Sequence, residues 1–311
     1  MSRKKKTWVI LGTAVAAVGL LALLLRPYWL NITFGISDFF RDLGLKDPAD
    51  IVRVDDQRYG EDPMQVLDVY YPAGTEGKLP AIVSIHGGGY VYGTKETYQY
   101  YCMNLAQRGF TVVNFSYRLG PKNKFPAQIE DTNAALRFVC ENAERYHIDT
   151  DCVFFVGDSA GGHLNAMYSA AVTNPEYAAL LGLEIPDYHL RATALNCGVY
   201  RLEDLLGSRE MLSLLEGDPS RYEEAWDILG HITDSFPPSF VMSATGDMCL
   251  PYAVPMAEYL RSAGVEAELH IYGDASNRLP HVFHVNMKSD DATRCNDEEC
   301  AFFRAHMDQA G

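Results

Sequence analysis

Residues 152–162 read Cys-Val-Phe-Phe-Val-Gly-Asp-Ser-Ala-Gly-Gly, an apolar run that leads directly into a turn of small residues around Ser159. A short, continuous apolar run bounded by glycine predicts a buried strand. The flanking glycines let this strand and a following helix approach closely, so the turn is expected to be tight. Such a turn would lift the Ser159 hydroxyl out of the strand end. It would also leave the Ala160 N–H at a helix N-terminus, where partial positive charge stabilises an anion.

A second glycine loop follows another apolar run, because residues 81–89 read Ala-Ile-Val-Ser-Ile-His-Gly-Gly-Gly. Backbone N–H groups can reach the negative oxygen of a tetrahedral intermediate where no side chain intervenes. The loop therefore fits an oxyanion hole, with donors expected at Gly88, Gly89 and Ala160. A phosphate-binding loop is the alternative, but no Gly-Lys-Ser/Thr follows. His86 is expected to brace the loop and to transfer no proton.

With these two loops, the chain resembles the hormone-sensitive-lipase-like esterases of the α/β-hydrolase superfamily, which combine HGGG with GDSAGG. The likeness extends to Y-R-L at 117–119, F-P-A at 125–127 and Asp131. It covers roughly residues 50–305. The resemblance implies a serine, an acid and a histidine in that chain order, with Ser159 as the nucleophile.

The acid is expected just beyond the apolar strand at 240–244. Asp247 lies there, where a carboxylate can orient an imidazole without taking its proton. A helix N-cap is the alternative role for Asp247. Asp274, in a predicted loop beyond the next strand, is the fallback acid. In the family a second acid often follows, but Leu-Pro-Tyr at 250–252 occupies that place here.

Two neighbouring histidines compete for the role of base. The family's H-x-F pattern implies His281, with Phe283 in the aromatic place. His281 also follows a predicted strand at 268–272, in a loop that can reach Ser159. His284 is expected to pack on the following turn.

Strands and helices alternate from Pro80 onward, which predicts an α/β fold with a mostly parallel α/β-hydrolase sheet and helices on both faces. Strands are expected near 51–55, 66–71, 81–85, 111–115, 152–156, 191–197, 240–244 and 267–272. Helices are expected near 97–108, 127–145, 160–173, 252–263 and 292–308. A short helical cap is expected at about residues 200–236, within a catalytic domain spanning 31–311.

Residues 1–30 are expected to form a separate basic segment and membrane anchor. Positions 8–25 are eighteen uncharged and mainly apolar residues, which at about 1.5 Å per residue nearly cross a bilayer core. Lysines at 4–6 precede the run, and only Arg26 follows it closely. This asymmetry predicts one N-terminal transmembrane helix with an extracytoplasmic catalytic domain. A cleaved signal peptide of a secreted protein and a cytoplasm-facing domain are the alternatives.

The composition limits the partners. The formal charge is −15, and the first thirty positions hold five basic residues and no acid. The remaining 21 basic and 41 acidic residues therefore give the rest of the chain a net charge of −20. This charge disfavours nucleic acid as a partner. The seven cysteines are expected to be buried free thiols, because several lie in apolar runs. No motif indicates a metal or an organic cofactor.

The resemblance implies a serine carboxylesterase that hydrolyses short-acyl esters of small molecules through an acyl-enzyme. Ser159, Asp247 and His281 would be its catalytic residues, and Tyr90 and Tyr92 are candidate substrate-binding rings. One alternative is an amide hydrolase resembling arylacetamide deacetylases or arylformamidases, and a prolyl-peptidase-like enzyme is a weaker one. A non-catalytic binding protein of the same fold is the alternative from a different class.

Overall fold

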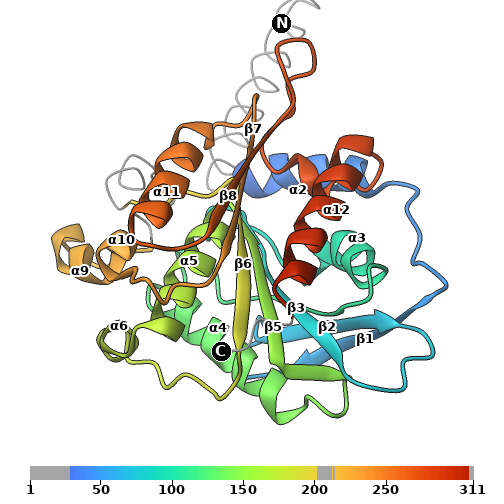
Figure 1. Cartoon of the computed structure of the whole chain (residues 1–311), viewed down its shortest axis with the longest axis horizontal. Helices are drawn as coiled ribbons and strands as arrows, with labels where there is room; N and C mark the ends of the chain where they lie inside the picture. The colour runs from blue at the N-terminus through green and yellow to red at the C-terminus, as the bar shows by residue number, and fades with distance from the viewer. Residues whose placement is uncertain (1–28, 202–211, 213, 308–311) are drawn as a thin grey trace, which may run out of the picture. The chain divides into compact units, whose positions relative to one another are not determined.

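The computed structural model describes most of the 311-residue chain (Figure 1). The residues that it describes are 29–201, 212 and 214–307. The chain divides into two compact units, the first ending at Leu43 and the second beginning at Gly44.

In the first unit, the described part is helix α2 (Trp29–Asp42) and Leu43. The helix presents large apolar side chains to solvent, among them Ile36 and Phe39, which are 54% and 61% exposed. Within the described ranges, no helix is both long enough and apolar enough to cross a membrane. The anchor predicted at 8–25 lies outside the described residues.

The second unit is built on one eight-stranded sheet with the order β1-β2-β4-β3-β5-β6-β7-β8 (Figure 1). Only the β1–β2 and β2–β4 pairs are antiparallel, and the other five pairs are parallel. The mostly parallel sheet predicted from the sequence is therefore confirmed. The strands are β1 (Ile51–Arg58), β2 (Val66–Pro72), β3 (Leu79–Ile85), β4 (Thr111–Phe115), β5 (Ile148–Asp158), β6 (Leu190–Asn196), β7 (Ser239–Ala244) and β8 (Ala267–Tyr272).

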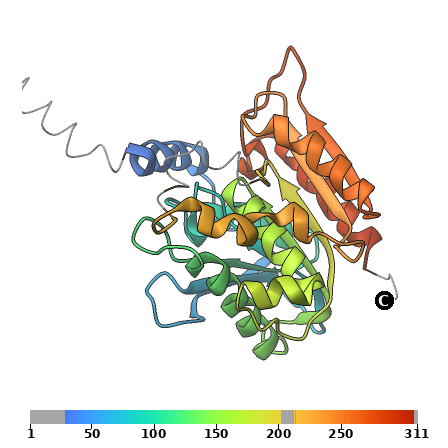
Figure 2. The ribbon, with the colours of Figure 1, turned by 90° about the vertical axis from the view of Figure 1, so that its left-hand side faces the viewer.

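Helices cover both faces of this sheet (Figures 1 and 2). On one face lie α3 (Lys95–Ala106) and α12 (Asp290–Ala305). On the other lie α4 (Ala127–Glu141), α5 (Ala160–Thr173) and α11 (Leu250–Ser262). The shorter helices are α6 (Pro175–Leu180), α9 (Glu223–Trp226), α10 (Ile228–His231) and the 3₁₀ turns η2 (Pro219–Tyr222) and η3 (Phe283–Val285).

The alternation of side chains along β5 explains why both faces are apolar. Phe154 stacks on Phe303 of α12, with ring centroids 4.7 Å apart. The next residue, Phe155, lies 5.8 Å from the ring of Tyr168 on α5. Successive side chains of a strand point to opposite faces, so a strand covered on both sides reads as a continuous apolar run. The apolar run at 152–156 therefore fills both layers of the core.

Two parts of the domain differ from the sequence pattern. Helix α6 was not predicted, although Asn174 caps it by accepting the N–H groups of Glu176 and Tyr177, and a proline follows the cap. The predicted cap at about 200–236 lies partly outside the described residues, and its described part contains η2, α9 and α10.

Candidate active site

The turn around Ser159 joins β5 to α5 in a strained conformation. Ser159 has φ +54° and ψ −120°, which a non-glycine residue adopts only when its surroundings hold it there. Its N–H donates to the carbonyl oxygen of Asn196 at the end of β6, at 3.0 Å. A Cβ added at Gly161 would overlap the carbonyl oxygens of Ile85 and His86. Close backbone packing therefore fixes the turn, and Ala160 begins the helix.

The second glycine loop is held from several sides. Gly88 has φ +107°, and a side chain there would overlap the Tyr92 carbonyl, so the position requires glycine. The hydroxyl of Tyr117 donates to the His86 carbonyl at 2.9 Å, and the two rings stack 4.1 Å apart. Burial lowers the pKa of His86 to about 4, so its imidazole is neutral near pH 7. His86 Nδ1–H donates to the Gly87 carbonyl, so this histidine braces the loop.

Asp247 and His281 form a hydrogen-bonded pair. The Nδ1–H of His281 donates to Asp247 Oδ1 at 2.6 Å. The same carboxylate accepts the Ser243 hydroxyl at 2.6 Å and the Cys249 backbone N–H at 2.8 Å. The Asp247 side chain is fully buried, whereas the His281 side chain is 21% exposed. The histidine is thus anchored on its buried side and open on the other.

Burial by itself would favour the neutral form of Asp247, yet the pKa of this carboxyl lies below its ordinary value. The hydrogen bond and charge of His281, followed by hydrogen bonds from Ser243 and Cys197, outweigh the desolvation. Cys197, which follows β6, was not predicted as part of the site. No motif marks it, and only the pairing of β6 with β7 brings its thiol to Asp247.

Within the described part of the chain, Cys197, Asp247 and His281 form a group that could hold a metal, since their ligand atoms lie within 4.8 Å of one another. However, Asp247 and His281 approach to 2.6 Å. Two ligands each about 2.0 Å from a tetrahedral zinc ion lie about 3.3 Å apart. The geometry therefore fits a proton-bearing hydrogen bond better than a shared metal.

The topology brings the predicted site residues to one edge of the sheet. Ser159 follows β5 and Asp247 follows β7, and these parallel strands flank β6. His281 is more than eight residues beyond the end of β8, but a parallel bridge between Gly246 and Pro280 returns its loop to Asp247. The carboxyl edge of a parallel sheet is where ligands bind in such folds.

The alternative base His284 and the fallback acid Asp274 lie elsewhere in the fold. His284 lies in η3, is 1% exposed and packs edge-to-face against Tyr101, with centroids 5.2 Å apart. Asp274 is exposed, and its carboxylate accepts the N–H groups of Ser276 and Asn277 in a turn. The structure therefore pairs His281 with Asp247 and uses Asp274 to close the loop after β8.

The stacking role considered for Tyr90 needs correction. Tyr90 is 3% exposed, its hydroxyl is hydrogen-bonded to His163 Nδ1 at 2.6 Å, and its ring packs against Tyr117. Burial lowers the pKa of His163 to about 3, so this pair is neutral. Tyr90 therefore braces the glycine loop from within. Tyr92 is partly exposed.

A small cavity lies at the first part of α11, and none of the predicted catalytic residues lines it. Its volume is about 220 Å³. The residues lining it include Tyr200, Leu229, Pro251, Tyr252 and Met256, from the segments that follow β6 and Asp247. Cavities that bury a drug-sized ligand are usually about 300–1,000 Å³, so this one suits a small group.

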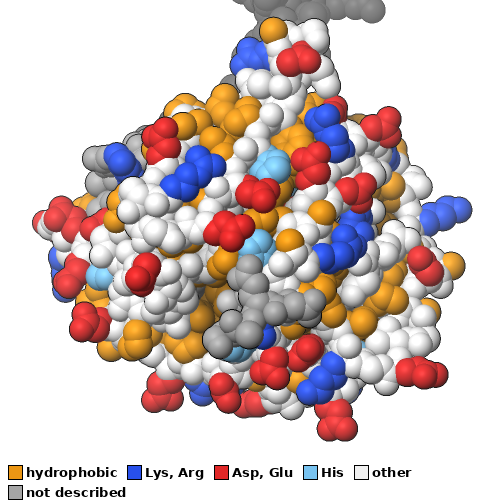
Figure 3. Space-filling model, viewed as in Figure 1, with side chains coloured by type: hydrophobic (Ala, Val, Ile, Leu, Met, Phe, Trp, Pro, Cys, Tyr) orange, Lys and Arg blue, Asp and Glu red, His pale blue; other side chains and the backbone are white. Residues whose placement is uncertain are grey.

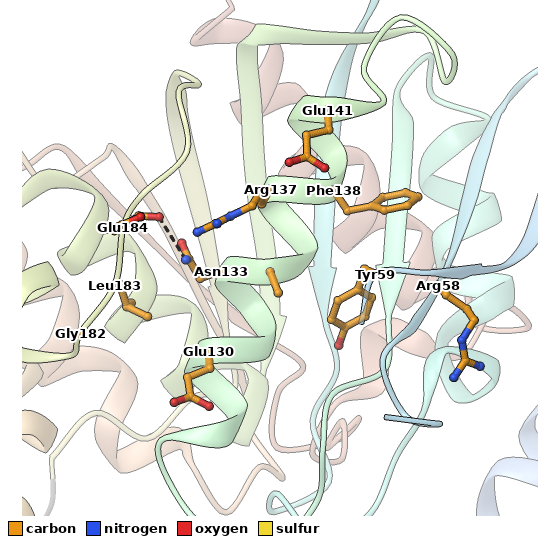
Figure 4. Close-up of a pocket in the computed structure, with 11 residues that line it drawn as sticks. Arg58, Tyr59, Glu130, Asn133, Arg137, Phe138, Glu141, Gly182, Leu183 and Glu184 are labelled. Carbon is orange, nitrogen blue, oxygen red and sulfur yellow. Dashed lines mark hydrogen bonds between the residues drawn. The ribbon is translucent and has the colours of Figure 1, made fainter. Parts of the chain in front are cut away.

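A larger cavity of about 560 Å³ lies along α4 (Figure 4). Tyr59, Arg137 and Phe138 line it, and Asn133 donates to the Glu184 carbonyl at its wall. None of the predicted site residues lines this cavity. Its position gives it no part in the chemistry of Ser159.

All seven cysteines are free, and six of them are buried, as predicted. On the face shown in Figure 3, acidic and basic side chains are both scattered over the surface.

Comparison with known proteins identifies the family. The model of the BD-FAE family matches residues 67–256, more than half of the chain. Isoprenylcysteine alpha-carbonyl methylesterase ICME of Arabidopsis thaliana is 25% identical over 277 residues, which are 84% of this chain and 62% of the relative. Esterase LipC of Mycobacterium tuberculosis is 26% identical over 209 residues, 62% of this chain and 51% of the relative. The chain thus spans about half to three-fifths of these relatives.

Among solved structures, esterase B from Lactobacillus rhamnosis has a TM-score of 0.84 and 24% identity, over 94% of this chain and 97% of its own. This likeness concerns the fold. Together with the family match and the two glycine loops, it shows that the chain belongs to the BD-FAE family and has the fold of the α/β-hydrolase esterases, as the resemblance of its motifs implied.

Proposed function

We propose that this chain is a serine carboxylesterase that hydrolyses esters with a short acyl group. The observation that carries the proposal is the 2.6 Å hydrogen bond between His281 Nδ1 and Asp247, at the sheet edge where Ser159 follows β5. Matching relatives named as esterases add support. An imidazole held by a buried carboxylate, beside a serine in a strained turn, is an arrangement for nucleophilic acyl transfer.

In the proposed reaction, Ser159 Oγ attacks the ester carbonyl while His281 Nε2 takes the hydroxyl proton. The bond to the alcohol then breaks, and the imidazolium returns the proton to the leaving oxygen, which gives a Ser159 acyl-enzyme. A water molecule attacks this acyl group by the same route and releases the acid. Asp247 stays ionised throughout and holds the Nδ1–H of the imidazole, a role that its lowered pKa supports.

The oxyanion of each tetrahedral intermediate would accept N–H groups of Gly88, Gly89 and Ala160. Each such donor typically lowers the barrier by about 3 kcal/mol. The left-handed backbone of Gly88 and Gly89, with φ +107° and +60°, supports this role because it turns the loop's N–H groups away from regular pairing.

Substitution of the nucleophile tests the proposal. Ser159→Ala should lower ester turnover by at least about 10⁴-fold and abolish covalent labelling by a fluorophosphonate. Labelling that persists in the variant would exclude Ser159 as the nucleophile, and a wild-type protein that neither labels nor turns over would favour a binding protein. A panel of aryl esters beside acetanilide and formyl amides separates the esterase from the amide hydrolase.

The short acyl group is proposed because the segment expected to cap the site, at about 200–236, is too short to suggest a long acyl tunnel. We expect p-nitrophenyl acetate or butyrate to exceed the palmitate ester by about tenfold or more in kcat/KM, which corresponds to about 1.4 kcal/mol. A preference for palmitate would contradict this part of the proposal. The segment at about 200–236 is proposed to cap the site.

We also propose that residues 8–25 anchor the protein in a membrane, with the catalytic domain outside the cytoplasm. The support is the uncharged run and the lysines that precede it. The full chain should resist carbonate extraction from membranes, and protease added outside intact cells should digest the catalytic domain. Protection from protease would reverse the orientation, and a soluble form lacking the first thirty residues would indicate a cleaved signal peptide.

A further inference from the structure

One tyrosine hydroxyl connects the two glycine loops of the proposed active site. Tyr98 lies on α3 and is 6% exposed. Its hydroxyl donates to Asp158 Oδ2 at 2.7 Å and accepts the backbone N–H of Gly87 at 3.1 Å. Asp158 directly precedes Ser159, and Gly87 directly precedes the proposed oxyanion donor Gly88. A two-bond bridge therefore runs from one loop to the other.

The two loops approach closely at this bridge. A Cβ added at Gly87 would lie 2.6 Å from Asp158 Oδ2 and 3.2 Å from the Tyr98 hydroxyl. Asp158 is 2% exposed, so water has little access to its carboxylate. If the hydroxyl were lost, the Gly87 N–H would lose a buried acceptor, and the carboxylate would lose a donor. Such losses cost about 1–3 kcal/mol each.

Other tyrosines hold the glycine loop elsewhere, which singles out the contribution of Tyr98. The Tyr117 hydroxyl donates to the His86 carbonyl, and Tyr90 is bonded to His163 on α5. These bonds fix the start and the wall of the loop. Tyr98 makes the bond that ties the loop's backbone to the carboxylate beside the nucleophile.

We propose that Tyr98 is a positioning residue for the oxyanion hole, an inference that rests on the proposed esterase function. Oxyanion donors act when they lie 2.7–3.1 Å from the developing negative charge, and a displacement of about 1 Å can cost about 100-fold in rate. By setting the spacing between Gly87 and Asp158, the Tyr98 hydroxyl sets the spacing between the Gly88 and Gly89 donors and Ser159. This spacing affects the transition state more than the bound substrate.

The test compares Tyr98→Phe with Tyr70→Phe in the full chain. Tyr70 is a matched control because it is buried and its hydroxyl donates to a buried carboxylate, Asp68 Oδ2, at 2.9 Å. It lies on β2 and contacts neither glycine loop through this bond. Both variants remove one hydroxyl and keep the ring, so both should lose stability to a similar degree.

For p-nitrophenyl acetate, Tyr98→Phe should lower kcat about tenfold or more with KM changed less than about twofold, while Tyr70→Phe should keep kcat within about twofold. An arylboronic acid, which forms an anionic tetrahedral adduct with the serine, should bind Tyr98→Phe more weakly by a similar factor. A merely structural role would not produce this parallel loss.

The inference is overturned if Tyr98→Phe keeps its kcat and boronate affinity while the wild type is active, or if both variants lose kcat equally. Loss in both variants would point to general destabilisation. A wild type that shows no ester turnover and no fluorophosphonate labelling at Ser159 would instead overturn the proposed function, and this inference with it.

Discussion

The nucleophile turn and the acid–histidine pair lie at the same sheet edge but are held in different ways. The turn at 157–162 is fixed by backbone contact, because a side chain at Gly161 would overlap two carbonyl oxygens of the neighbouring loop. The pair is fixed by hydrogen bonds to a side chain, because Ser243, the Cys249 N–H and His281 all donate to Asp247, with the Cys197 thiol beside them. Close backbone packing demands particular residues at particular positions. Side-chain bonds tolerate many arrangements, so their partners emerge only from the folded structure.

Buried carboxyl groups in the two regions have pKa values shifted in opposite directions. Asp247 keeps a lowered pKa, because a histidine and other donors outweigh its burial. Glu299 on α12 is linked to the nucleophile turn through Asn196, whose carbonyl accepts the Ser159 N–H. The Asn196 side-chain amide donates to Glu299 at 2.6 Å, and the Tyr101 hydroxyl donates to it at 3.1 Å. Burial dominates there and raises the pKa of Glu299 to about 7. Two neutral donors therefore do not compensate for the desolvation of this carboxyl group.

The largest effect is expected from a substitution that breaks the acid–histidine pair. His281→Ala should lower kcat/KM by about 10⁴-fold or more, because the base and the nucleophile act as a unit. His284→Gln should leave kcat within several-fold and lower the melting temperature, since His284 is buried against Tyr101. Steady-state kinetics and thermal unfolding of both variants separate the two roles. An inactive His284→Gln beside an active His281→Ala would reverse the assignment.

A pH titration of stability sharpens the contrast between the two carboxyl groups. Glu299 is protonated in both states below about pH 4.5, but above it the unfolded chain loses this proton first. Stability should therefore fall as the pH rises from about 4.5 to 7, by about 3 kcal/mol in total. Glu299→Gln should remove that slope in denaturant unfolding. Parallel curves for the two proteins would contradict the raised pKa.

Asp247 should contribute a pH dependence of stability opposite to that of Glu299. Its folded pKa is lowered below 3.8, so its contribution is complete above the unfolded pKa and is lost as the pH falls through the folded value. The stability difference between wild type and Asp247→Asn should thus shrink only in that acidic range. The same unfolding series, extended below pH 4, measures it. A difference that shrinks near pH 7 instead would contradict this account.

The smallest of these effects is expected from a substitution that disturbs the packing of the nucleophile turn. Gly161→Ala should cost about 1–3 kcal/mol of stability, because the new methyl group meets the rigid carbonyls of Ile85 and His86. Gly77→Ala is the matched control, since an added Cβ there meets nothing within 4 Å. Chemical denaturation measures both. Equal stabilities would show that the strand and helix can separate without cost.

The sequence predicted the elements of the fold closely, and it did so for a local reason. All eight strands were expected within a few residues of their bounds, because most of them are short apolar or alternating runs flanked by turn residues. The five long helices that cover the sheet were also expected near their bounds, whereas α6 was missed because its asparagine–proline start was overlooked. Tyr90, a candidate substrate-binding ring in the sequence, is buried by the tertiary fold against Tyr117 and His163.

By itself, the sequence determined the two glycine loops and the strand before each, because tight turns and backbone close approach restrict residue type at the turn itself. It also limited the base to two histidines and favoured His281 by resemblance. Only the tertiary structure decided that the Gly246–Pro280 bridge brings His281 to Asp247, that Cys197 joins them, and that Tyr98 connects the loops. These contacts join residues tens of positions apart, and strand order and loop return set such contacts rather than any local spacing.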